Sequence, residues 1–145
     1  MKKILITTGG SGGHVIPSLS IYDALKDDYE VQISTDLRGS KYINNEHYNY
    51  SLIDVPNLFS NLLLFPYNLI KFCISIIKSY QYLKLNNFNI LISTGGYMSL
   101  PLCLAANLLN IKIYIFEPNS VLGRANKLMP VSYTHLRAHE TRGNL

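Results

Sequence analysis

The chain has 145 residues, of which 48% are hydrophobic and 15% are charged, and this is enough for one domain with a packed core. The 13 Lys and Arg residues outnumber the 9 Asp and Glu residues, which gives a formal net charge of +4. Because no dense run of basic residues accompanies this excess, the composition excludes an extended nucleic-acid-binding surface and instead fits contact with phosphates or with an anionic lipid surface.

The N-terminus begins like a secretion signal, but its apolar run stops at Thr7. That run is too short for a signal sequence, so we expect a first strand and a protein that stays in the cytoplasm. Apolar, β-branched runs bounded by turn residues predict strands at residues 2–8, 30–35, 50–55, 89–94 and 112–117. Apolar side chains at helical spacing predict helices at residues 16–26 and 100–109, and residues 58–85 form a longer, strongly apolar segment.

Strands alternate with helices along the chain, which predicts an α/β fold with a doubly wound parallel sheet and right-handed crossovers. In such a sheet ligands bind outside the carboxyl ends of the strands. The glycine loops follow predicted strands directly, so we expect a binding site at that edge. Cys73 and Cys103 lie inside apolar runs, and we expect both to be small buried hydrophobic residues in a reduced compartment.

The first glycine loop, residues 9–13, stands between the first predicted strand and the first predicted helix. Glycines allow positive φ and close approach of a ligand, and amides at a helix start attract an anion, so a phosphate or diphosphate is the expected ligand. A dinucleotide fingerprint would need glycine at Val15, and a Walker A loop would need lysine at His14. We therefore expect Gly12 to be less replaceable than Gly39, which lies in a loop with no phosphate argument.

His14 follows this loop directly. An imidazole ordinarily titrates near neutral pH, so His14 could act as a general base toward a sugar hydroxyl. It could equally donate a hydrogen bond to a phosphate oxygen, or simply pack against or cap the first helix. The spacing alone does not separate these roles.

Three motifs together resemble a known family. Residues 9–17 read Gly-Gly-Ser-Gly-Gly-His-Val-Ile-Pro and resemble the Gly-Gly-Thr-Gly-Gly-His-x-x-Pro opening of the MurG family, the N-acetylglucosaminyltransferases that act on undecaprenyl-pyrophosphoryl-muramoyl-pentapeptide. Residues 95–101 resemble that family's Gly-Gly-Tyr-x-Ser-x-Pro, and residues 117–127 resemble its His-Glu-Gln-Asn segment with the Gly-x-x-Asn-Lys that follows. Phe116 and Pro118 depart from the family's histidine and glutamine.

The resemblance implies a Rossmann-like N-terminal domain of a GT-B glycosyltransferase whose C-terminal domain is missing from this chain. It implies an inverting transfer of N-acetylglucosamine from UDP-N-acetylglucosamine to the lipid-linked acceptor, without a metal or a cofactor. His14 would be catalytic, and the donor would be bound by Ser11, Gly12, Gly13 and Asn119. Residues that would contact the acceptor diphosphate or support the site are Gly9, Gly10, Gly95, Gly96, Tyr97, Glu117 and Asn126.

Residues 58–85 are very apolar and are interrupted by Lys71, Lys78 and Lys84 at helical spacing. Pro66 and Lys71 break any run long enough to span a bilayer. An apolar surface edged by lysines is typical of an interfacial helix on anionic lipid, while packing on the sheet would explain half of the same pattern. Because the family's acceptor is a membrane lipid, we expect peripheral binding to the cytoplasmic face of the bacterial inner membrane.

Residues 131–145 differ in composition from the rest of the chain and resemble a translated sequencing adapter. We expect the domain to span residues 1–130, with 131–145 a non-native tail outside the fold. His135 and His139 in this tail have a spacing found in metal sites, but we do not expect a metal there.

Two other functions remain open at this stage. A nicotinamide or flavin dinucleotide domain would use Asp36, at the end of the second predicted strand, to bind a ribose. A non-catalytic membrane-docking subunit of a split glycosyltransferase would borrow its donor site from a partner chain.

Overall fold

The computed structural model describes residues 1–55, 64–117 and 134–137. The described strands are β1 (Lys3–Thr7), β2 (Glu30–Thr35), β3 (Tyr50–Leu52), β4 (Ile90–Ser93), β5 (Lys112–Glu117) and β6 (Thr134–Arg137). The α-helices are α1 (Gly12–Leu25), α2 (Phe65–Asn86) and α3 (Leu100–Leu108), and the short 3₁₀ helices are η1 (Gly39–Tyr42) and η3 (Tyr97–Ser99).

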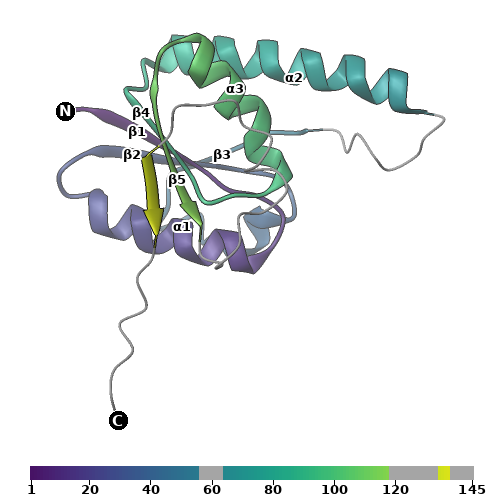
Figure 1. Cartoon of the computed structure of the whole chain (residues 1–145). Helices are drawn as coiled ribbons and strands as arrows, with labels where there is room; N and C mark the ends of the chain where they lie inside the picture. The colour runs from purple at the N-terminus through teal and green to yellow at the C-terminus, as the bar shows by residue number, and fades with distance from the viewer. Residues whose placement is uncertain (56–63, 118–133, 138–145) are drawn as a thin grey trace.

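The six strands form one parallel sheet in the order β3-β2-β1-β4-β5-β6. The chain moves outward from β1 to β3 and then returns across the sheet to β4, β5 and β6. Because crossovers between parallel strands are right-handed, the two directions place their helices on opposite faces. Figure 1 shows this arrangement, with α1 on one face and α2 and α3 on the other. The expected doubly wound α/β fold is confirmed.

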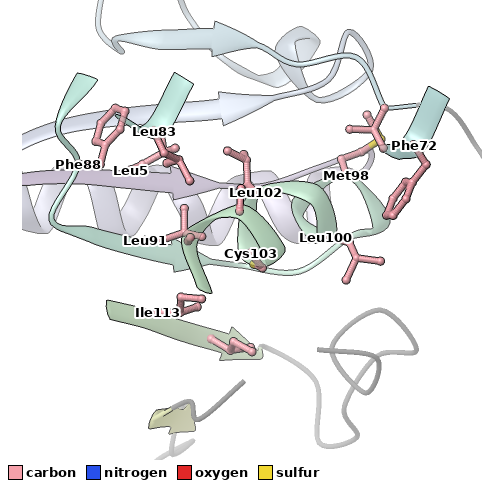
Figure 2. Packing of buried hydrophobic residues seen from close by; sticks show 14 residues of the cluster. Leu5, Phe72, Leu83, Phe88, Leu91, Met98, Leu100, Leu102, Cys103 and Ile113 are labelled. Carbon is pink, nitrogen blue, oxygen red and sulfur yellow. The ribbon is translucent and has the colours of Figure 1, made fainter. Parts of the chain in front are cut away.

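Side chains alternate between the two faces along each strand, and this divides the core in two. On one face, Leu5 and Leu91 are fully buried and pack with Leu102 and Cys103 of α3, as Figure 2 shows. On the opposite face, Ile4 and Ile6 belong to the cluster that contains Val15 and Tyr22 of α1. The near-continuous apolar runs of the central strands follow from this burial on both faces.

Some element boundaries differ from the sequence prediction. The first helix begins at Gly12 rather than at residue 16, so the last two glycines of the first loop belong to its first turn. The third strand covers only Tyr50–Leu52. Residues 131–145 were expected outside the fold, whereas residues 134–137 pair with β5 as strand β6. The domain boundary and the origin of the tail stay predictions.

The two cysteines differ in environment. Cys103 is fully buried, and burial raises the pKa of its thiol to about 12, so it is an unreactive core residue as expected. Cys73 is exposed on α2, so its prediction as a buried residue was wrong: the apolar side of this helix faces outward. Within the described parts of the chain, no helix is long and apolar enough to cross a membrane.

Gly39 is more constrained than the sequence indicated. It is buried at the start of η1, and a Cβ atom there would collide with the Thr35 hydroxyl and lie 3.3 Å from Val15 Cγ2. The expected contrast between Gly12 and Gly39 concerns the approach of a ligand and stays a prediction, but packing constrains Gly39 more tightly than Gly12. At Gly12 the nearest atom to an added Cβ belongs to the exposed ring of Tyr42, at 3.3 Å.

We expect Gly39→Ala to lower the free energy of unfolding by about 1–3 kcal/mol, because the added methyl group overpacks a site that has no free space. Gly13→Ala is the matched control, since a Cβ there would meet only Ser11 Oγ, at 3.9 Å. Urea unfolding of the 145-residue protein followed by circular dichroism measures both. Equal stabilities of the two variants would contradict the packing argument.

Candidate anion-binding site at the carboxyl edge of the sheet

The site lies where the sheet reverses its strand order. Strands β1 and β4 are neighbours although some 80 residues separate them, and the amide of Thr94 donates to the carbonyl of Thr7 at 3.0 Å, beyond the last paired residues. On the other side of β1, the amide of Thr8 donates to the carbonyl of Ser34 at 2.9 Å. The loops that follow β1, β2 and β4 therefore emerge together, at the reversal point where doubly wound sheets bind ligands.

The two glycine loops touch through their backbones. Gly96 has φ of +91°, and a Cβ on it would lie 3.2 Å from the carbonyl oxygen of Gly9. A Cβ on Gly9 would lie 2.7 Å from Cβ of Met98. Both positions therefore require glycine, and the expectation that Gly9 and Gly96 support the site has a steric reason.

The start of α1 presents free donors. Ser11 is the N-cap residue, its amide donates to the carbonyl of Gly9 at 2.9 Å, and its exposed side chain does not cap the helix. The amide of His14 donates to the carbonyl of Ser11 at 3.0 Å. The amides of Gly12 and Gly13 have no acceptor among the residues that the structure describes, so they can donate to an anion at the positive end of the helix dipole.

Asp36 fixes the loop that precedes this helix. Its buried Oδ1 accepts from the amide of Gly10 at 3.0 Å and from the amide of Gly39 at 2.8 Å, and its Oδ2 accepts from Arg38 Nε at 3.0 Å. Burial by itself raises the pKa of the Asp36 carboxyl, but the two amides and the guanidinium outweigh burial and hold the pKa below its ordinary value of 3.8. Gly10 keeps its φ of +73° under this constraint.

His14 connects the first helix to the second glycine loop. Its Nδ1 lies 2.8 Å from the carbonyl oxygen of Thr94, and the Thr94 hydroxyl donates to the carbonyl of His14 at 3.0 Å. Because a carbonyl oxygen only accepts, Nδ1 carries the proton, and in the neutral ring Nε2 is the basic nitrogen. This half-buried histidine is thus held in the tautomer that a general base needs.

The second glycine loop is held mainly by its own contacts. The amide of Gly95 donates to Ser93 Oγ at 3.2 Å, and the hydroxyl of Ser99 donates to the carbonyl of Gly96 at 2.7 Å. The ring of Tyr97 packs against Phe72 of α2, with centroids 5.9 Å apart. Tyr97 therefore links the loop to the helix α2, which fits a supporting rather than a catalytic role.

Two predicted site residues have no described position, and Glu117 lies further along the same edge of the sheet. Asn119 and Asn126 lie outside the described residues, as does His139. Glu117 is the last residue of β5, and His135 lies in β6. Among the residues that the structure describes, no group of three His, Cys, Asp or Glu side chains could hold a metal ion.

The structure also adds residues that sequence reasoning did not assign to the site. Thr94 orients the histidine, and Arg38 and Gly39 complete the contacts of Asp36. For Arg38 and Gly39 the sequence contains one signal, because both follow Asp36 closely at the end of the second predicted strand. The sequence suggests Asp36 only as a ribose ligand. Because its oxygens already accept three hydrogen bonds, the structure gives no support to that dinucleotide interpretation.

Fold and candidate site together define a parallel α/β domain with two glycine loops at the carboxyl edge of its sheet, and comparison with known proteins identifies its family. The sequence profile of the glycosyltransferase family 28 N-terminal domain matches residues 4–136. The chain therefore belongs to this family.

Two curated relatives carry the name UDP-N-acetylglucosamine–N-acetylmuramyl-(pentapeptide) pyrophosphoryl-undecaprenol N-acetylglucosamine transferase. The protein from Pelagibacter ubique is 52% identical over 126 residues, which cover 87% of this chain and 35% of the relative. The protein from Rickettsia felis is 39% identical over 129 residues, 88% of this chain and 35% of the relative. The resemblance to the MurG family is confirmed, and the chain spans about a third of the length of these relatives.

Solved structures agree on the fold. The crystal structure of Acinetobacter baumannii MurG superposes with a TM-score of 0.75 at 24% identity, over 89% of this chain and 39% of that one. The Streptomyces glycosyltransferase SsfS6 superposes with a TM-score of 0.60 at 13% identity, over 88% of this chain and 42% of that one.

We expect Asp36→Asn to lower the free energy of unfolding at pH 7 by about 1–3 kcal/mol, because the new side chain keeps one acceptor oxygen but loses the negative charge and the acceptor of the Arg38 bond. Since the pKa of Asp36 is lowered in the folded protein, the carboxylate contributes this stability above pH 3.8 or so, and the contribution is lost as the pH falls toward the lowered pKa. Urea unfolding between pH 3 and pH 7 should show the two proteins converging in acid. A difference in stability that does not change with pH would contradict the role of the ionised carboxylate.

Proposed function

We propose that this chain is the acceptor-side part of an enzyme that transfers N-acetylglucosamine from UDP-N-acetylglucosamine to undecaprenyl-pyrophosphoryl-N-acetylmuramoyl-pentapeptide in peptidoglycan synthesis. One observation carries the proposal: an oriented histidine stands beside two touching glycine loops, in a chain that is 52% identical to a relative with that name.

The geometry supports a general-base mechanism with inversion. His14 Nε2 takes the proton of the acceptor's sugar hydroxyl while its oxygen attacks the anomeric carbon of the donor. The bond from that carbon to the diphosphate breaks, and UDP leaves with the electron pair. The amides of Gly12 and Gly13 bind a diphosphate oxygen, and Ser11 and Asn119 contact the donor.

Helix α2 supports the membrane part of the proposal. Its buried residues form one stripe that faces the domain, and three of the five are polar. The five are Asn68, Phe72, Ser75, Ser79 and Leu83. The outward side exposes large apolar side chains instead: Tyr67, Ile70, Ile74 and Ile77 are 44–62% exposed.

Lysines accompany this outward apolar side. Lys71, Lys78 and Lys84 are all exposed, and Lys71 Nζ lies 4.5 Å from the centroid of the Tyr67 ring. An exposed apolar stripe with basic residues is the pattern of a helix that lies in a lipid headgroup region. We infer that α2 binds the cytoplasmic face of the inner membrane peripherally, which brings the lipid-linked acceptor to the glycine loops.

The catalytic proposal is tested in a chimera, because a GT-B site forms between two domains. Residues 1–129 are joined to the remainder of the Pelagibacter ubique relative, and transfer of N-acetylglucosamine to a lipid-linked acceptor is measured. We expect transfer by the chimera and none by the 145-residue chain. His14→Ala in the chimera should lower turnover by about a hundredfold to ten-thousandfold, the usual contribution of a general base.

His47→Ala is the control, because His47 is exposed and lies in the loop before β3. Unchanged turnover in His14→Ala would mean that His14 packs in the structure but does not act in catalysis. If the chimera is inactive while the 145-residue chain binds lipid, the result would instead favour a non-catalytic docking subunit.

The membrane proposal is tested by co-sedimentation of the 145-residue chain with vesicles, with and without anionic lipid. Replacing Lys71, Lys78 and Lys84 by Glu should weaken binding to anionic vesicles by roughly a hundredfold or more. Wild-type binding should also weaken with salt, because screening acts over about 10 Å at 0.1 M ionic strength.

The control replaces Lys2, Lys41 and Lys112 by Glu, since these lysines are equally exposed but lie outside α2. If the wild type stays in the supernatant under all conditions, or if both triple variants lose the same affinity, α2 is not the membrane-binding surface.

A further inference from the structure

Arg38 lies at the rim of the first glycine loop, although it belongs to the segment between β2 and η1. Its side chain is 71% exposed, so it is not a core residue. A methyl group added to Gly10 would lie 3.2 Å from Arg38 Nη2, which places the guanidinium directly against the backbone of Gly10.

The guanidinium is held in this place despite its exposure. Its Nε donates to Asp36 Oδ2 at 3.0 Å, and the Asp36 side chain is only 8% exposed. The other oxygen of the same carboxylate accepts from the amide of Gly10. One buried carboxylate therefore orients both the loop and the arginine, so their relative position is fixed by a single group.

The outer end of the guanidinium remains available. Among the residues that the structure describes, none accepts a hydrogen bond from the Nη atoms of Arg38. The amides of Gly12 and Gly13, two and three residues beyond Gly10, are likewise without an acceptor. A planar fork of donors beside Gly10, in the loop that leads into these amides, suits a phosphate group better than a neutral ligand.

We propose that Arg38 binds the diphosphate of a sugar substrate at the first glycine loop. The identity of that substrate rests on the proposed function, but binding of the diphosphate does not. Arg38 adds a fixed positive charge to the neutral donors of α1, and Asp36 orients it rather than contacting the ligand.

The test titrates the ¹⁵N-labelled 145-residue chain with inorganic diphosphate and follows the amide signals of Gly12 and Gly13. We expect these signals to shift in the wild type. Arg38→Gln should weaken binding about tenfold or more, the loss expected for a charged hydrogen-bond donor. Lys41→Gln is the matched control, because Lys41 is an exposed cation of η1, and should change affinity less than about twofold.

Arg38→Lys provides a second variant, since it keeps the charge and loses the planar fork; we expect an affinity between those of the wild type and Arg38→Gln. The amide spectrum of each variant reports whether the fold is intact. Absence of binding by the wild type, or equal losses in Arg38→Gln and Lys41→Gln, would overturn the proposal.

The source of the diphosphate is identified by repeating the titration with uridine diphosphate and with a short prenyl diphosphate. If the affinity for uridine diphosphate depends on Arg38, the diphosphate belongs to the donor; if the affinity for the prenyl diphosphate does, it belongs to the lipid acceptor. If neither affinity depends on Arg38, the proposal is overturned. The outcome is separable from the proposed function: an active chimera with Arg38-independent binding would refute this inference alone.

Discussion

The close backbone contact between Gly9 and Gly96 is the constraint on which the site depends. It exists because β1 and β4 are adjacent parallel strands, so that the loops that follow them leave the sheet side by side. Only at this distance can the His14 ring reach the Thr94 carbonyl from the first turn of α1. A side chain on either glycine would separate the loops, and the histidine would lose the hydrogen bond that sets its tautomer.

Asp36 shows how a charge can be buried here at a tolerable energetic cost. A carboxylate removed from water is strongly destabilising unless hydrogen bonds replace its hydration. The three donors to Asp36 come from the first glycine loop, from the start of η1 and from Arg38. The same bonds that compensate its burial therefore join three parts of the candidate site.

Helix α2 reverses the usual amphipathic arrangement. A helix that only covers a sheet turns its apolar stripe inward, whereas α2 buries Asn68, Ser75 and Ser79 and exposes Ile70, Ile74 and Ile77. The inward side also buries Phe72 and Leu83, and the Phe72 ring packs against Tyr97 of the second glycine loop. The helix whose outward side is proposed to contact lipid is therefore joined to that loop by direct packing.

Much of the architecture follows from local patterns in the sequence. The apolar runs located the strands, and strand–helix alternation required the doubly wound sheet, because parallel neighbours need crossovers. The glycine loops and His14 were predicted as candidate site residues because each follows a strand end. The hydrogen bonds between Thr94 and His14 and the space around Gly39 were decided only in three dimensions, because contacts between residues 80 apart and the packing around a glycine are not encoded in a local pattern. The bond from Arg38 to Asp36 is local, but the approach of its guanidinium to Gly10 depends on the folded sheet. The apolar side of α2 faces outward because the other side of the helix packs against the domain. Periodicity identifies the faces of a helix but not which of them is buried.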